Sequence, residues 1–95
     1  MRYVKMHKGE TFNSHDVLRT IIENAPKGMN LVEMRQRMRI LDLLANPEAD
    51  HILIEEADYA VLKTALQNFS FSIVHADIIA IADAVEGARA APSLI

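Results

Sequence analysis

The four histidines are the side chains best suited to bind a metal ion, but their spacing does not favour a shared site. They are His7, His15, His51 and His75. No two of them lie three or four residues apart, and the chain has no cysteine. Carboxylates such as Asp16 and Asp77 lie one and two residues from a histidine, and such neighbours do not share a helix face. We therefore predict that the chain binds no metal ion or other cofactor.

Residue types typical of catalysis are present, but their arrangement does not favour an enzyme. Ser14, His15 and Asp16 are the three residue types of a hydrolytic triad, yet a triad converges from separate elements rather than from consecutive residues. Ser14 is better explained as a helix cap. The pair Glu55 and Glu56 suits the positive end of a helix dipole. The three glycines are too dispersed to form a phosphate-binding loop. We predict no catalytic residues.

Basic and amide side chains cluster in a helix that we predict over residues 31–45. They are Arg35, Gln36, Arg37 and Arg39. Their types suit contacts with base edges, so one hypothesis is a winged helix-turn-helix DNA-binding regulator with a wing that begins at strand 51–55. The alternative is a solvated face in which Arg37 pairs with Glu33 and Arg39 pairs with Asp42. The formal net charge of −3 favours the solvated face.

A second predicted helix, over residues 73–86, is apolar on nearly all sides, which in a short chain requires central burial or a partner. Its candidate self-association residues are Ile78, Ile79, Ile81 and Val85. Asp77 and Asp83 lie six residues apart, so we expect one of them at a rim or capping a neighbouring backbone group. By contrast, we expect Met29, Met34 and Met38 in the core rather than on an adaptable partner surface.

The apolar periodicity of the segments that carry these residues predicts a mostly helical α+β fold, with four helices and a two-stranded element. We predict strands at 2–6 and 51–55, paired with each other, and a first helix that begins at Asn13 or Ser14 and ends at Pro26. The helix over 31–45 begins at an Asn30–Glu33 capping box. Its expected core stripe is Leu31, Met34, Met38, Leu41 and Ala45, widened by Leu44.

The remaining elements are a helix over 56–68 and the helix over 73–86, capped by Ser72. The alternation at 69–74 fits either a strand or a connection, and we prefer the connection. We expect residues 88–95 to form a loose tail.

The amino-acid composition limits the classes of protein to which this chain can belong. The chain has 95 residues, of which 51% are hydrophobic and 24% charged, as expected for one folded domain over 1–95. It contains no apolar run of the roughly 18–20 residues that cross a bilayer, and its N-terminus is too charged for a secretory signal. We therefore expect no membrane association and a cytoplasmic location.

The stretch from Gly28 to Ala88 resembles a group of small proteins encoded in phage and prophage genomes. The matching phrases are Gly28-Met29-Asn30-Leu31-Val32-Glu33-Met34-Arg35-Gln36-Arg37, Ile40-Leu41-Asp42-Leu43-Leu44, Glu56-Ala57-Asp58-Tyr59 with Leu62, and Asp77-Ile78 with Asp83-Ala84-Val85. The phrases are those of a fold rather than of a reaction, so the resemblance implies no activity and no functional residue. It implies a phage accessory protein that acts in the host cytoplasm or in the particle.

The sequence thus favours a non-enzymatic protein-interaction module over a DNA-binding regulator. Its expected partner is a second copy of the chain or a host or phage protein, and its expected role is in phage assembly or in the control of a host protein. Nucleic acid is the less favoured partner.

Overall fold

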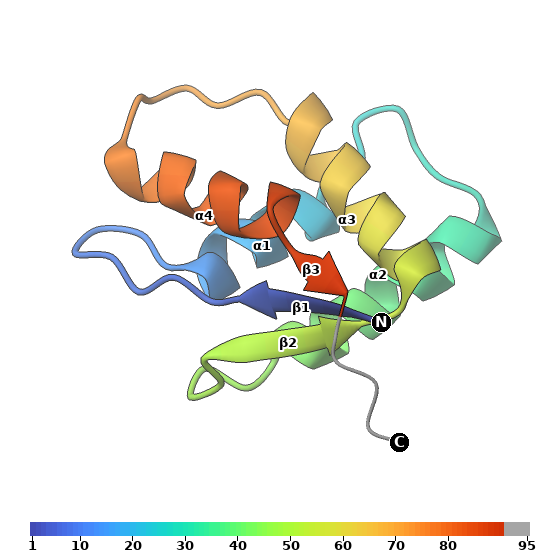
Figure 1. The fold of residues 1–95 in the computed structure, drawn as a ribbon. Helices are drawn as coiled ribbons and strands as arrows, with labels where there is room; N and C mark the ends of the chain where they lie inside the picture. The colour runs from blue at the N-terminus through green and yellow to red at the C-terminus, as the bar shows by residue number, and fades with distance from the viewer. Residues whose placement is uncertain (91–95) are drawn as a thin grey trace, which may run out of the picture.

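The computed structural model describes residues 1–90, so the part of the predicted tail at 91–95 lies outside the described residues. Over these ninety described residues the fold is α+β and mostly helical, with four helices and a small antiparallel sheet, which confirms the predicted class (Figure 1). In chain order the elements are β1 (Arg2–Lys5), α1 (Ser14–Glu23), α2 (Leu31–Leu44), β2 (His51–Ile54), α3 (Glu56–Asn68), α4 (Ala76–Glu86) and β3 (Arg89–Ala90).

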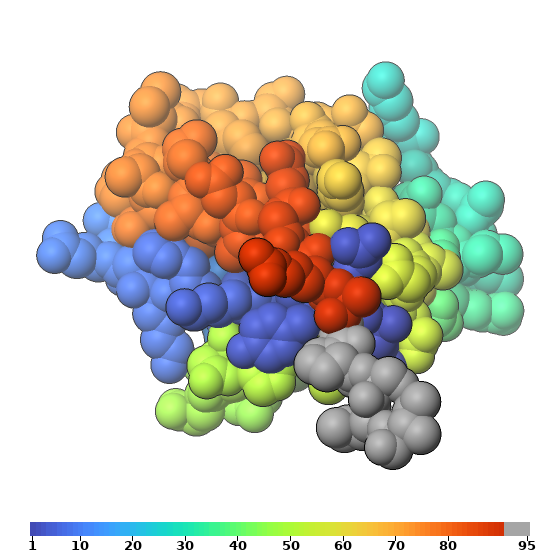
Figure 2. All heavy atoms as spheres, viewed as in Figure 1, coloured from blue at the N-terminus to red at the C-terminus, as the bar shows by residue number. Residues whose placement is uncertain are grey.

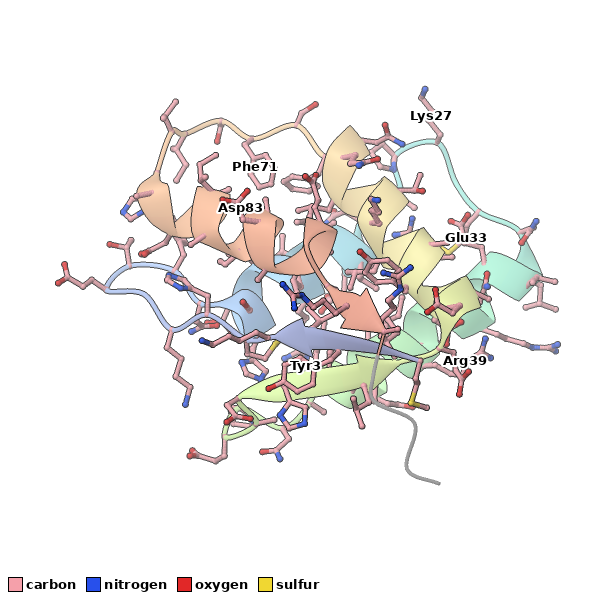
Figure 3. All side chains as sticks on the ribbon, in the orientation of Figure 1. Tyr3, Lys27, Glu33, Arg39, Phe71 and Asp83 are labelled. Carbon is pink, nitrogen blue, oxygen red and sulfur yellow. The ribbon has the colours of Figure 1, made fainter. Side chains whose placement is uncertain are left out.

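The sheet has the strand order β2-β1-β3, and the predicted pairing of the first two strands is confirmed. Val4 lies opposite Ile52, and both are buried, whereas their neighbours Tyr3 and Leu53 lie opposite each other on the open face. This alternation follows from the two-residue period of a strand, which sends successive side chains to opposite faces. The sheet therefore has one face in the core and one face toward solvent, where Figure 3 shows Tyr3.

The third strand corrects the expectation of a loose tail from residue 88. Ala90 pairs with Arg2 and Arg89 pairs with Tyr3, while Ala88 is buried. Arg2 holds this end in place, because its guanidinium donates to the Ala88 carbonyl at 2.8 Å. Figure 2 shows β1 enclosed between β3 and β2. A two-residue strand is too short to produce a sequence period, so the pattern could not have indicated it.

One contiguous core joins the inner face of the sheet to the helices. Its fully enclosed side chains include Leu18 of α1, Ile40 of α2, Leu62 of α3 and Ile81 of α4. Tyr59 crosses this core and donates its hydroxyl to the Val85 carbonyl at 2.6 Å. The buried phenol therefore has the partner that its polar atom requires.

Helix α1 begins at one of the two predicted caps, since the Asn13 side chain accepts from the Asp16 amide at 2.9 Å. Ser14 is not the cap, because its hydroxyl instead accepts from the His7 amide at 2.7 Å. Leu18, Ile21 and Ile22 form its buried stripe. His15 is also buried. It lies three residues before Leu18 and seven before Ile22, so helical geometry places all three side chains on the same side of the helix.

Helix α4 begins three residues later than predicted. Its cap is His75 rather than Ser72, because the His75 ring Nδ1 accepts from the Asp77 amide at 3.0 Å. Residues 69–75 contain no strand and connect α3 to α4, in agreement with the preferred interpretation. Serine is the commoner cap and histidine is not, which explains why the pattern favoured Ser72.

Asp77 fixes the loop before α1 to the start of α4. Its carboxylate accepts from the amides of Thr11 and Phe12 at 3.1 and 3.2 Å and meets His7 Nε2 at 3.1 Å. This confirms that one of the two aspartates caps a neighbouring backbone group, while Asp83 stays exposed. The approach is close enough that a Cβ at Gly9 would overlap the Asp77 carboxylate.

Candidate interaction surface

Helix α2 begins at the predicted cap. The Asn30 side-chain oxygen accepts from the Glu33 amide at 2.8 Å, and Glu33 forms the predicted ion pair with Arg37 at 3.1 Å. Both contacts satisfy groups of the first turn, where free amides and the helix dipole favour acceptors and negative charge. These contacts therefore define Leu31 as the first residue of the helix. Because a helix has a regular period, they also define the direction in which each later side chain points.

The face of α2 that points away from the core carries three large apolar side chains, which we call the outer stripe. Leu31, Met34 and Met38 are 59%, 47% and 56% exposed. Spacings of three and four residues place them along one side of the helix. Ala45 continues this side beyond the last turn and is also exposed, and Leu41 between them is half-buried. The stripe that the sequence predicted exists, but most of it faces solvent.

The expectation that Met34 and Met38 lie in the core is therefore wrong. The core face of α2 is formed instead by Ile40 and Leu44, which are buried, together with the stem of Arg37. Met29, in the turn before the helix, is half-buried. The row of α2 that occupies the core therefore contains only two buried apolar residues, beside Glu33 and Arg37.

Arg37 explains this choice. Its side chain is 12% exposed, and its guanidinium donates to the Ile22 carbonyl at 2.9 Å and to the Asn24 carbonyl at 3.4 Å. These carbonyls lie at the C-terminal end of α1, which has no basic residue in its own last turn. A helix C-terminus leaves carbonyls unpaired and favours a cation, and Arg37 supplies both the donors and the charge. Turning Arg37 toward α1 turns the outer stripe toward solvent.

Two opposite charges lie beside the outer stripe. Arg35 and Asp42 are both exposed and stand seven residues apart, on the same side of α2. Within residues 1–90 neither side chain forms a hydrogen bond or an ion pair. The surface thus combines an apolar row with one positive and one negative group along one edge.

The other basic residues of α2 are engaged within the chain. Arg39 forms two hydrogen bonds of 2.9 Å with the carboxylate of Asp58, whose side chain is only 4% exposed. This pair replaces the predicted contact between Arg39 and Asp42, and the hydrogen bonds that Arg39 donates to Asp58 raise the pKa of Arg39. Figure 3 labels Arg39 on the ribbon. Of the four residues proposed to read DNA, Arg37 and Arg39 already bind protein groups, Gln36 is half-buried, and Arg35 is exposed.

The structure also changes the interpretation of α4. Three of its four candidate self-association residues, Ile78, Ile81 and Val85, are buried within this chain. Only Ile79 remains exposed, at 59%. Helix α4 packs against β1 and α3 with the side that carries these three residues, and its opposite side faces solvent. A face containing all four residues is therefore not available to a partner.

A shallow apolar groove of about 380 Å³ lies between α1, the 69–75 connection and α4. Its apolar walls include Phe12, Ile21, Phe71 and Ile78. Figure 3 shows Phe71 beneath the connection, between α3 and α4. Its polar lining comes from Asp16 and small hydroxyl side chains, so the groove offers contact area but no convergent reactive groups.

Within residues 1–90, no three histidine or carboxylate side chains are arranged to hold a metal ion. The same part of the chain contains no helix with the length and apolarity needed to cross a membrane. No family model, curated protein or solved structure matches this chain.

Proposed function

We propose that this chain is a non-enzymatic protein-interaction module and that its docking surface is the outer stripe of α2. The observation that carries the proposal is the solvent exposure of Leu31, Met34 and Met38 along one helix side. When a partner covers an exposed apolar side chain, the complex is stabilised by about 25 cal/mol for every Å² of apolar surface removed from water. A contiguous apolar row therefore favours association in a way that single exposed residues do not.

The residue types support an adaptable contact. Methionine is unbranched and polarizable, so Met34 and Met38 can fill an irregular partner surface without a fixed shape of their own. Helices that dock on other proteins use anchors spaced by three, four and seven residues, and Leu31, Met34 and Met38 have this spacing.

Rigid support of the surface favours binding as well. Arg37 anchors α2 to α1, and the bidentate pair between Arg39 and Asp58 anchors it to α3. A helix held at two places presents its outer stripe in one orientation, which lowers the entropy lost when a partner binds.

The setting follows from the resemblance to small phage and prophage proteins. We propose that the module acts in the host cytoplasm or in the particle, in phage assembly or by control of a host protein. The phrases that carry the resemblance include Leu31 and Met34, two of the three residues of the outer stripe, together with Arg35.

Site-specific photocrosslinking in the host cell tests the surface. A photoreactive phenylalanine analogue at Met34 is expected to yield discrete protein adducts, because a bound partner would lie within reach of that side chain. The matched control carries the same analogue at Ile79, which is somewhat more exposed than Met34 but lies on α4. Adducts that form at position 79 and not at 34, or at neither position, would overturn the proposal.

A further inference from the structure

We infer that the outer stripe of α2 binds the same stripe of a second copy, so that two α2 helices pack antiparallel about a two-fold axis near Met38. This inference rests on the proposed function and names the partner. It follows from two features of α2 that specify the same axis independently: the spacing of the apolar residues and the position of the charges beside them.

The apolar spacing is that of a two-helix seam. Leu31, Met34, Met38, Leu41 and Ala45 are separated by three, four, three and four residues. This alternation keeps one row of side chains facing a second helix, and it is the pattern by which paired helices interlock. The midpoint of the row is residue 38.

The charges beside the row are complementary to their own two-fold image. Arg35 and Asp42 lie on the same side of the seam, in equivalent positions one heptad apart. In an antiparallel pair centred between residues 38 and 39, Arg35 of each copy meets the partner's Asp42, which gives two ion pairs. In a parallel pair the two-fold axis would run along the seam and place Arg35 and the partner's Asp42 on opposite flanks, so these ion pairs could not form.

The two midpoints therefore agree, at residue 38 for the apolar row and between 38 and 39 for the charges. A two-fold interface requires a surface that is complementary to itself, and this face places Arg35 opposite the partner's Asp42 and Met38 opposite its own copy. The side chains of Arg35 and Asp42 form no hydrogen bond or ion pair within residues 1–90, whereas those of Arg37 and Arg39 do.

The interface is small. Stable protein complexes bury about 800 Å² on each partner, and three large exposed side chains with two flanking charges supply less. We therefore expect reversible pairing with a dissociation constant on the order of 100 µM, above the range of standard-size interfaces.

Charge exchange tests the geometry in the full chain. By sedimentation equilibrium, Arg35→Asp and Asp42→Arg should each raise the dissociation constant about tenfold, since each single change sets like charges against each other. The double variant, Arg35→Asp with Asp42→Arg, should return the constant to within about twofold of the wild type. Both positions are exposed, so the fold itself should tolerate these changes.

Engineered cysteines give a second readout, because the natural chain has none. Met38→Cys should form an intermolecular disulfide on mild oxidation, since the two copies of residue 38 meet at the axis. Leu31→Cys should not, because in the antiparallel pair the two residues stand roughly 20 Å apart along the helices, far beyond the 4.4–6.8 Å between Cα atoms that a disulfide requires. Val74→Cys is the control for chance collisions at a fully exposed site.

The outcomes separate this inference from the proposed function. A wild-type chain that stays monomeric to millimolar concentration while Met34 still crosslinks to other proteins overturns self-pairing and leaves the interaction module standing. A dimer whose double variant is not restored, or that forms the Leu31→Cys disulfide as fast as the Met38→Cys disulfide, overturns the antiparallel geometry. Absence of both a dimer and Met34 adducts overturns both proposals.

Discussion

Helices α2 and α4 use their apolar residues in opposite ways. Helix α4 buries Ile78, Ile81 and Val85 and exposes one isoleucine, because it has β1 on one side and α3 on another. Helix α2 buries only Ile40 and Leu44 and leaves its outer stripe in solvent. The difference shows that the position of a helix in the fold, rather than the apolar content of its sequence, determines which of its residues remain available to a partner.

The largest expected difference between the helices is in their cores. Ile81→Ala in α4 should lower the free energy of unfolding by about 2–5 kcal/mol, because it leaves a cavity at a fully enclosed site. Ile40→Ala in α2 should cost a similar amount, since that residue is equally enclosed. Urea denaturation measures both losses. If Ile40→Ala were nearly neutral, the assignment of the inner face of α2 would be wrong.

The next largest effect should come from the residue that orients α2. Arg37→Ala should lower the free energy of unfolding by about 1.5–3 kcal/mol, because it removes charge-assisted hydrogen bonds to the end of α1. The matched control is Arg35→Ala on the exposed side of the same helix, which should stay within about 0.5 kcal/mol of the wild type. Equal losses for the two variants would contradict the role given to Arg37.

A smaller effect should appear in the pH dependence of α4. The hydrogen bonds from His7, Phe12 and Thr11 lower the pKa of Asp77 from 3.8 to about 2. A carboxyl group whose pKa is lower in the folded state stabilises the fold above its ordinary pKa and loses that contribution as the pH falls. Stability should therefore decrease between about pH 4 and pH 2.

Asp77→Asn should flatten this acid limb in thermal melts recorded across that range. A residual slope is expected from Asp50, because the hydrogen bond from His51 also lowers its pKa. An unchanged acid limb in Asp77→Asn would show that the contact between α4 and the loop before α1 does not depend on the charge of Asp77.

The smallest effect on stability should come from the outer stripe itself. Met38→Ala should change the free energy of unfolding by no more than about 0.5 kcal/mol, because the side chain is largely in solvent. Urea denaturation at low protein concentration measures this without a contribution from pairing. A loss above about 2 kcal/mol would mean that Met38 packs in the core of the monomer.

The sequence was sufficient to predict the helices and the principal strand pair. The caps at Asn13 and Asn30 and the breaks near Pro26 and Pro47 are local signals, and local signals set element boundaries. Local signals did not predict the cap of α4 at His75, because a histidine cap depends on the orientation of the ring in the folded chain.

The orientation of α2 could not be read from the sequence. The row that includes Leu31 and Met38 looks like a core stripe, while the opposite row includes Glu33 and Arg37 and looks polar. What decides between them is the unpaired end of α1, which attracts Arg37. That contact joins two helices, and the periodicity of the sequence does not indicate how they lie relative to each other. For the same reason, the sequence pattern did not indicate that the proposed surface is exposed.

The concentration dependence of methionine methyl resonances tests the proposed surface most directly. The chain has five methionines, of which Met6 is buried in the core and Met34 and Met38 lie on the outer stripe. In a dilution series of methyl-labelled protein, we expect the Met34 and Met38 methyl signals to shift as the concentration rises toward millimolar, while the Met6 signal stays constant. Met34 and Met38 signals that do not move, in a sample whose other surface signals shift with concentration, would show that the chain associates through a different face.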